Sequence, residues 1–413
     1  AGTTVSTTEQ ATNDYDATLN IKLADETGSS DALTVGLNNA TTQDDITLVT
    51  TAIETVTLKG AATGINAGTT VDASGVAASS LIITGGVAAS GLNLSGAALN
   101  KTVTSIDTSG FSGIVNVKAS TSAVATGVTV TAGTIITEGV SADTFVGTTA
   151  TGKTDSFTGN FGATETASDL VTQLSKFENY TMSFTDGVAI AANTNQGFGD
   201  GDNVVKSVTL TGGLVSSTYT ATDGYIDGAN LTSFDASGLG GAISIQVNAG
   251  ANTGTSSTNG NLGSVLTIKG SSSATTDKVE YLTNGLAVTA ASTTGKLLTE
   301  NVETVVLTTA TNASTVDAAG LVGVKTIAVE AAQSVTLKNL AAGTNLQLGA
   351  IKTSATDEYT GTLTYSLADA TGASDALTVS MLATGSANET NAILVGTGVE
   401  TLTLASATTS NES

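Results

Sequence analysis

Short segments in which apolar and polar residues alternate run through the whole chain. Examples are Val56-Thr57-Leu58, Val208-Thr209-Leu210, Val335-Thr336-Leu337 and Leu402-Thr403-Leu404. A period of two is that of a strand with one buried face, so we expect the apolar residues to point inward and Thr outward. Turns rich in Gly and Asn recur at intervals of roughly ten residues. This pattern predicts an all-β fold, either a repeat-built β-solenoid or chained β-sandwich modules.

One segment departs from the alternating pattern and has helical spacing. Between residues 168 and 177, Leu170, Leu174 and Phe177 fall on one face of a helix, and Ser168 is a suitable N-cap. We therefore expect at most one short helix, of one or two turns.

Internal repeats indicate how the strands are organised. The segment from Leu23 to Val35 returns from Leu367 to Val379 with few changes. Its core is Ser/Thr-Asp-x-apolar, which an apolar-Glu-Thr/Asn strand follows at a nearly constant spacing. The pattern occurs four times, as Asp31 with Glu54, Asp155 with Glu178, Asp277 with Glu303, and Asp375 with Glu400. The sequence thus predicts β-repeat modules at residues 1–150, 151–275 and 276–370, and the start of a fourth at 371–413.

A second motif is an apolar residue followed by Asp, a small residue, Ser or Ala, and Gly. It occurs at Asp72, Asp107, Asp235 and Asp317. Asp and Ser bond to the backbone of their own turn, and Gly accepts a positive φ. We interpret the motif as a turn that feeds the next strand.

The composition narrows the range of functions. The chain has 413 residues and no Cys, His, Pro, Trp or Arg, and its formal net charge is −23. Such a negative chain repels nucleic acid and anionic membranes, so neither is expected as a partner. Hydrophobic residues make up 40% and aromatic residues 4%, which predicts a core of Val, Ile, Leu and Ala. Without Cys the chain can form no disulfide and no thiolate metal site, and we interpret this usage as that of a protein exported unfolded and left outside the cell.

The missing residue types also argue against an enzyme. No Ser-His or Cys-His pair can form without His and Cys. Enzymes that cleave polysaccharides with two carboxylates usually hold the sugar with Trp, or with Arg for acidic sugars, and the chain has neither. No apolar run is long enough to span a membrane, and no amino-terminal signal peptide is present; it was removed, or the chain is a fragment, or the export signal lies elsewhere.

Oxygen is the only ligand type the chain offers to a metal, and it favours Ca²⁺. The best local signal is a glycine-rich loop that carries Asp200, Asp202 and Asn203. The further candidate ligands are the repeated aspartates and the first turn aspartate, namely Asp31, Asp155, Asp277, Asp375 and Asp72. An alternative stays open for the repeated aspartates, because each carboxylate could instead cap a turn through backbone amides. The repeated Glu residues precede strands, where a charge prevents wrong pairing.

Several short motifs resemble a known family. Ser141-Ala142-Asp143-Thr144-Phe145-Val146 resembles the end of the glycine-aspartate calcium repeats of RTX proteins. The Asp-Ala-Leu-Thr-Val and Val-Glu-Thr-Leu-Thr-Leu segments resemble those of bacterial S-layer proteins exported by type I secretion. The resemblance implies a calcium-dependent two-dimensional lattice on the cell exterior, with an uncleaved carboxy-terminal export signal. The chain lacks the tandem Gly-Gly-x-Gly-x-Asp nonapeptides of that family.

Together these features predict a secreted, extracellular structural subunit of a calcium-dependent bacterial surface layer (S-layer). We expect it to be a repeat protein that self-assembles, with further copies of itself as its main partner. A cell-surface polysaccharide could bind through a region outside this chain. The alternative is a large secreted adhesin or biofilm matrix protein made of similar modules. Outward Thr residues are also typical of ice-binding surfaces, but irregular strand spacing argues against one flat Thr array.

Overall fold

The computed structural model describes most of the strands and the corners between them. The described residues are 3–6, 17–23, 28–38, 45–87, 90–120, 127–134, 143–147, 154–161, 174–188, 204–214, 218–227, 230–248, 264–283, 287–293, 295–309, 312–331, 333–348, 361–369, 371, 375–382 and 393–407. They divide into two compact units, Ala1–Val188 and Ala189–Ser413.

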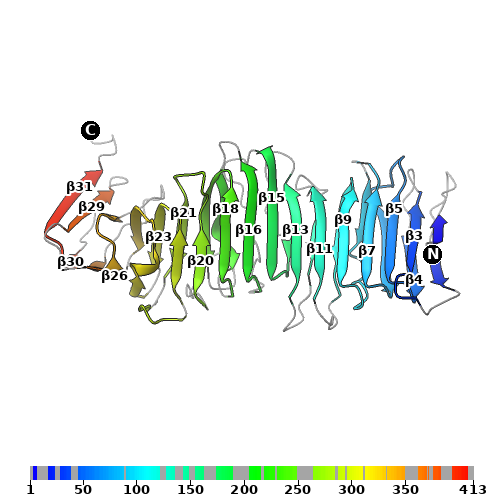
Figure 1. Ribbon diagram of the computed structural model, residues 1–413, viewed down its shortest axis with the longest axis horizontal. Coiled ribbons are helices and arrows are strands. Elements are labelled where there is room, and N and C mark those ends of the chain that lie inside the picture. Colours follow the sequence, from blue (N-terminus) through cyan, green and yellow to red (C-terminus); the bar gives the residue numbers. More distant parts are fainter. Residues whose placement is uncertain are drawn as a thin grey trace. The chain divides into compact units, whose positions relative to one another are not determined.

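Unit 1 contains two sheets, and the chain alternates between them. One sheet holds β1 (Thr3–Ser6), β3 (Ala32–Leu37), β5 (Thr55–Gly60), β7 (Ser80–Gly85), β9 (Ser105–Phe111), β11 (Thr129–Thr134), β13 (Ser156–Phe161) and β15 (Asn179–Val188). The other holds β2 (Ala17–Lys22), β4 (Asp45–Thr51), β6 (Thr69–Val76), β8 (Gly91–Leu94), β10 (Ile114–Lys118), β12 (Thr144–Val146) and β14 (Leu174–Ser175). Successive strands of a sheet lie side by side in Figure 1.

Unit 2 is built in the same way. One sheet holds β16 (Ser207–Leu214), β18 (Ser233–Leu239), β20 (Leu266–Lys269) and β22 (Leu297–Glu300). A second holds β17 (Thr218–Asp227), β19 (Ala242–Asn248), β21 (Lys278–Leu282), β23 (Thr304–Thr309), β25 (Thr326–Ala331), β27 (Asn345–Leu348), β29 (Ala376–Leu382) and β31 (Thr401–Ala407). A third holds β24 (Ser314–Asp317), β26 (Val335–Leu340), β28 (Thr362–Leu367) and β30 (Ile393–Thr397), and the single 3₁₀ turn of the described residues is η1 (Ala318–Gly320).

Every described strand pair is parallel, and neighbouring strands are one turn of the chain apart. Val56 lies opposite Leu81, and Leu81 lies opposite Ile106, so these two consecutive turns have the same length. Other turns differ in length, and the turn from Ile327 to its partner Leu346 is shorter. Parallel strands that return to the same sheet after each circuit form a β-solenoid. The predicted fold class is therefore confirmed, in its solenoid form.

The inside of each turn is apolar, as the alternation predicted. The inward residues of β5, Val56 and Leu58, are fully buried, while Thr55 and Thr57 between them are half-buried on the outer face. An aromatic cluster interrupts the aliphatic core of unit 1. Its members are Phe145, Phe157, Phe177 and Tyr180, with ring centroids 5.2 to 6.4 Å apart.

The predicted helix is wrong where the structure describes it. Residues 168–173 lie outside the described residues, but Leu174 and Ser175 form β14, and Lys176 has a φ of 65°. Leu174 pairs with Phe145 of the preceding turn, and both side chains are buried. The three-residue spacing of Leu174 and Phe177 reflects a corner between two strands, at which both side chains turn inward. None of the described helical segments is long and apolar enough to cross a membrane.

Candidate functional site

The four repeated Asp–Glu pairs connect neighbouring turns of the solenoid. In each pair, Asp and Glu stand just before strands that lie side by side. The backbone N–H of the Asp donates to Oε2 of the Glu, at 2.7 Å for Asp31–Glu54, 2.6 Å for Asp155–Glu178, 3.0 Å for Asp277–Glu303 and 2.9 Å for Asp375–Glu400. The backbone N–H of each Glu returns a bond of 3.0 to 3.2 Å to the Asp carbonyl. The nearly constant spacing of Asp and Glu in the sequence is therefore the length of one solenoid turn.

A left-handed residue makes the corner that carries each Glu. The residue two positions before the Glu has a positive φ in all four pairs: 55° at Ala52, 65° at Lys176, 55° at Asn301 and 78° at Gly398. Three of these residues are not glycine, so the surrounding structure must hold a conformation that costs of the order of 1 kcal/mol. In the first three pairs a buried apolar residue follows, namely Ile53, Phe177 or Val302. The sequence motif is thus a tight corner between strands, anchored by one apolar side chain.

Two of the corners require glycine in the preceding turn. Gly147 and Gly270 lie against the carbonyl oxygens of Lys176 and Asn301, and a Cβ at either position would collide with that oxygen. Their N–H groups donate to Ser175 O and Glu300 O at 2.9 and 2.8 Å. Backbone therefore packs directly on backbone at these corners, which only glycine permits.

The aspartate carboxylates extend the contacts to a third turn. Asp155 Oδ1 accepts a 2.7 Å bond from the N–H of Val128, and Asp277 Oδ1 accepts one of the same length from Ile243. Each buried carboxylate thus binds the turn before it, while its own N–H is bound by the Glu of the turn after it. These two pairs therefore hold three consecutive turns in register. This geometry supports the capping alternative for Asp155 and Asp277.

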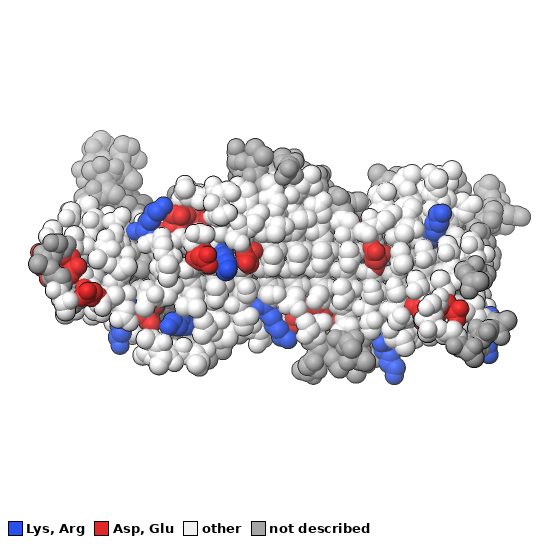
Figure 2. Space-filling model, viewed as in Figure 1, with Lys and Arg blue, Asp and Glu red and all other residues white. Residues whose placement is uncertain are grey.

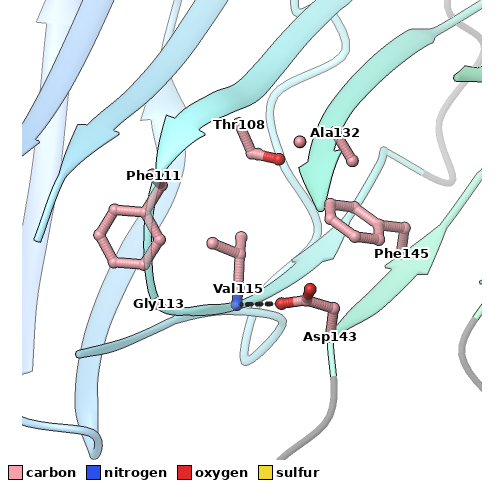
Figure 3. Close-up of a pocket in the computed structure, with 8 residues that line it drawn as sticks. Thr108, Phe111, Gly113, Val115, Ala132, Asp143 and Phe145 are labelled. Carbon is pink, nitrogen blue, oxygen red and sulfur yellow. Dashed lines mark hydrogen bonds between the residues drawn. The ribbon is translucent and has the colours of Figure 1, made fainter. Parts of the chain in front are cut away.

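Asp143 has the same role, and the sequence did not assign it to a pair. It is buried, and its Oδ1 accepts a 2.7 Å bond from the N–H of Val115 one turn earlier (Figure 3). The signal that could have found it is Asp143-Thr144-Phe145, which matches the Asp-x-apolar core of the repeat. Beside it, Thr108, Phe111 and Phe145 help to line a cavity of about 10 Å³, the size of one water molecule. That is far too small for an organic ligand.

The carboxylate of Asp277 has a strongly perturbed pKa. It is fully buried, its N–H is bonded to Glu303, and its Oδ2 has no hydrogen-bond partner. Burial raises the pKa of Asp277 to about 6; the N–H of Ile243 opposes the increase, the charge of Glu303 adds to it, and the backbone N–H of Ser271 weakly opposes it. The ammonium of Lys325 lies 3.8 Å from Glu303 and partly balances that second carboxylate. Asp277 therefore exchanges its proton close to neutral pH.

The second repeated motif is a bulge inside a strand in three of its four occurrences. Asp72, Asp107 and Asp235 lie within β6, β9 and β18. After each one, two residues stand opposite a single residue of the neighbouring strand, which defines a β-bulge. The predicted Asx bond is present, because each Oδ1 accepts the N–H two residues later at 2.9 to 3.0 Å. The predicted position was wrong: the motif lies in the strand rather than ahead of it.

The fourth occurrence, at Asp317, does make a turn. Its side chain is buried and caps η1 by accepting the N–H of Ala319 at 3.1 Å and the amide of Asn339 at 2.8 Å. Lys296 lies 3.7 Å from Oδ2. Burial acts to raise the pKa of Asp317, but these hydrogen bonds and the ammonium group outweigh it and lower the pKa.

Those predicted metal ligands that the structure describes do not gather in one place. Asp200, Asp202 and Asn203 lie outside the described residues. Asp31, Asp155, Asp277 and Asp375 each lie beside one Glu, and Asp72 bonds to its own bulge. In the described part of the chain, no group of three or more Asp or Glu could hold a metal ion. The Oδ2 atoms of Asp277 and Asp375 are buried and have no hydrogen-bond partner. Each of these two corners therefore has one carboxylate oxygen that could ligate a metal ion.

A row of small polar side chains crosses the outer face of the first sheet of unit 1. The register aligns Thr55, Ser80, Ser105, Thr129, Ser156 and Asn179 on six neighbouring strands. Only Thr55 and Thr129 in this row are threonines, so the row is polar but is not a Thr array. The next row contains Ile82 and Asp107 between its Thr residues, so a two-row Thr array does not form. Figure 2 shows scattered charges separated by uncharged surface on the face in view.

Comparison with known proteins gives no relative for the chain. No protein-family model, no curated protein and no solved structure matches it.

Proposed function

We propose that this chain is a structural subunit of a calcium-dependent bacterial surface layer, which self-assembles into a two-dimensional lattice on the cell exterior. The observation that carries the proposal is the use of the repeated acidic residues to join turns of a solenoid. Glu54, Glu178, Glu303 and Glu400 all bond to backbone N–H groups of the preceding turn. The most regularly repeated hydrogen bonds of the chain thus join successive turns of the solenoid, as a structural protein requires.

The charge of the chain supports the calcium dependence. With 36 acidic and 13 basic residues, Lys is too scarce to pair every carboxylate. Each bound Ca²⁺ removes two negative charges, and an ion that binds only the folded state stabilises it by about 2.7 kcal/mol at a hundred times its dissociation constant. Several such ions would rival the stability of an ordinary domain.

Two groups of residues are the proposed calcium ligands. Asp200, Asp202 and Asn203 form an oxygen-rich sequence of the kind that Ca²⁺ prefers. Asp277 and Asp375 each offer a buried Oδ2 that has no hydrogen-bond partner. Because Ca²⁺ takes six to eight oxygens, backbone carbonyls and water would have to complete a site at either corner. The proposed location is the exterior of the cell, where calcium is plentiful.

Electron microscopy of the purified chain in calcium and in EGTA tests the proposal. We expect planar arrays in calcium, dispersed particles in EGTA, and a lower melting temperature after calcium removal. A chain that stays monomeric and melts at the same temperature in both buffers contradicts the proposal. A calcium-stabilised monomer that instead binds a surface ligand identifies the alternative function, an adhesin or biofilm matrix protein.

A further inference from the structure

Three polar side chains on consecutive turns of unit 2 share one carboxylate. Asp317, at the end of β24, contacts a lysine of the turn before it and an asparagine of the turn after it. Its Oδ1 accepts the side-chain amide of Asn339 at 2.8 Å, and Nζ of Lys296 lies 3.7 Å from its Oδ2. We call these three residues the Lys–Asp–Asn triad. One carboxylate thus holds an amine on one oxygen and an amide on the other.

The centre of the triad is sheltered from water. The side chain of Asp317 is 0% exposed and that of Lys296 is 17% exposed. Nζ of Lys296 also donates to the carbonyl of Ala290 at 3.1 Å, which helps to keep the lysine beside the carboxylate. Oδ2 of Asp317 is buried and has no hydrogen bond, so it is the oxygen that can accept a proton from Nζ.

Two other ion pairs of unit 2 are more open to solvent. In Lys269–Glu300 the side chains are 40% and 59% exposed, and in Lys325–Glu303 the lysine is 66% exposed. A solvated ammonium stays protonated, whereas burial favours the neutral, nucleophilic amine. Of these three lysines, Lys296 is therefore the one whose surroundings favour reaction.

A β-bulge places the amide of the triad. The register between β26 and β28 shifts between Leu337 and Leu340, and Asn339 inside this shift has a φ of 56°. Asn adopts this left-handed conformation more readily than most residues, and bulges re-aim side chains beside active sites. The regular partner of Asp317 on β26 is Lys338. The bulge brings the neighbouring Asn339 amide to the same carboxylate.

We propose that the Lys–Asp–Asn triad forms an intramolecular isopeptide bond between Nζ of Lys296 and Cγ of Asn339, with Asp317 as the proton carrier. A proton first passes from the ammonium to Oδ2 of Asp317, which leaves a neutral amine. The lone pair of Nζ attacks Cγ, the Cγ–Nδ2 bond breaks, and the carboxyl delivers its proton to the departing nitrogen. Nζ loses two protons in all and the leaving group gains both. The products are one secondary amide and one ammonium ion, so no oxidant or cofactor is needed.

The arrangement of the triad favours this reaction in two ways. The amine and the amide are held on one carboxylate, which replaces a bimolecular encounter by a short movement of the flexible lysine side chain. Burial acts to raise the pKa of Asp317, but the hydrogen bonds from Asn339 and Ala319 and the ammonium of Lys296 lower it. The resting state is therefore the ion pair, and the neutral pair is a minor, reactive state. The bond then forms slowly, once in the life of each chain.

The bond would join the turns of β22, β24 and β26 covalently. It adds to the Asp–Glu hydrogen bonds, which link turns elsewhere in the solenoid. The inference goes beyond the proposed function and depends neither on calcium nor on assembly.

The mass of the denatured full-length chain tests the bond. We expect the wild-type chain to be lighter than its sequence by one ammonia molecule. K296R keeps the positive charge beside Asp317 but offers no amine, and N339G keeps a residue that accepts the positive φ but removes the amide. Both variants should have the full mass of their own sequences. K325R is the matched control, because Lys325 also lies beside a carboxylate, and it should lose ammonia as the wild type does.

Trypsin digestion identifies the two residues that are joined. Trypsin does not cut after an acylated lysine, so we expect a branched peptide in which Lys296 is uncut and is linked to the peptide that begins at Asn339. An asparagine that closes a ring on its own backbone also loses ammonia. That product gives only linear peptides, and its loss of ammonia persists in K296R.

D317N tests the proton carrier, because its amide keeps the shape of the carboxyl group but cannot carry the proton. We expect the full mass from a D317N chain whose circular dichroism matches that of the wild type. A wild-type chain of full mass, or an ammonia loss that persists in K296R, would overturn the inference, whatever the fold of D317N. A branched peptide in D317N at the wild-type level would overturn the role of Asp317. Each of these results leaves the proposed function intact, because assembly is measured separately.

Discussion

The corner at Asp277 and the bulge at Asp107 show two uses of the same side chain. At the corner, the carboxylate is buried and bonds to Ile243 of the preceding turn. At the bulge, the carboxylate of Asp107 is on the outer face and bonds to Ser109, two residues later, through both its N–H and its hydroxyl. The first joins turns that are distant in sequence, and the second shapes a strand locally.

The difference lies in the burial of the bonded groups. A buried N–H that loses its acceptor cannot turn to water, so the cost of removing the corner carboxylate includes desolvation. An exposed N–H at the bulge is solvated at once. The corners are therefore expected to carry the stability of the solenoid, and the bulges to adjust the course of single strands.

Replacing glycine by alanine should give the largest difference in lost stability between a corner and a bulge. Gly270→Ala places a Cβ against the carbonyl of Asn301. This carbonyl belongs to the backbone of the next turn, so it cannot move aside as a side chain can. Gly75→Ala at a bulge meets the Cγ2 methyl of Val49 at 2.8 Å, and a side chain can move more easily. We expect a loss of about 3 kcal/mol for the corner and about 1 kcal/mol for the bulge in urea unfolding. Equal losses would show that backbone packing at the corner is not special.

Removing a carboxylate should also destabilise the protein more at a corner than at a bulge, with a smaller difference than for the glycine substitutions. Asp155→Ala leaves the buried N–H of Val128 without its 2.7 Å acceptor, and we expect it to cost about 2 to 3 kcal/mol. Asp107→Ala removes an exposed bond and should cost less than about 1 kcal/mol. Urea unfolding followed by circular dichroism measures both variants. A bulge variant that is as damaging as the corner variant would contradict the division of roles.

The stability of the Asp277 corner should depend on pH. The folded pKa of Asp277, about 6, is above the ordinary value, so the folded state holds the proton more tightly than the unfolded state. Stability is then highest below about pH 4 and falls as the pH rises through 6. The shift of about two pKa units corresponds to a loss of about 3 kcal/mol for this residue.

Asp277→Asn is the variant that checks this assignment. The amide keeps the shape of the side chain and cannot ionise, so the loss between pH 4 and 7 should shrink. Titration of the Asp277 carboxyl carbon by NMR gives an independent measurement. A midpoint near pH 4, together with an unchanged pH profile in the variant, would refute the proton exchange proposed for this corner.

The repeated Asp and Glu residues could be recognised in the sequence. The contacts that they make could not, because these depend on which turns lie side by side. The Asp–Glu spacing was visible, and the capping alternative for the aspartates followed from their preference for backbone amides. That each Glu binds the N–H of its own Asp could not be predicted, because it depends on parallel register. The left-handed residues Ala52, Lys176 and Asn301 were missed for the same reason. Ala and Lys have no preference for that conformation, so packing at the corner imposes it on Ala52 and Lys176. Asn adopts it more readily, so Asn301 gave a weak signal.

The sequence by itself determined the class of the fold and the composition of its two faces. Alternation such as Val56-Thr57-Leu58 needs only the period of a strand to place Val and Leu inside and Thr outside. Only the tertiary structure decided that the strands are parallel, and that Leu174 and Phe177 form a strand and a corner rather than a helix. The physical reason is that alternation depends only on adjacent residues, whereas strand pairing depends on residues one solenoid turn away. Burial of those residues offsets the loss of chain entropy on closing the turn.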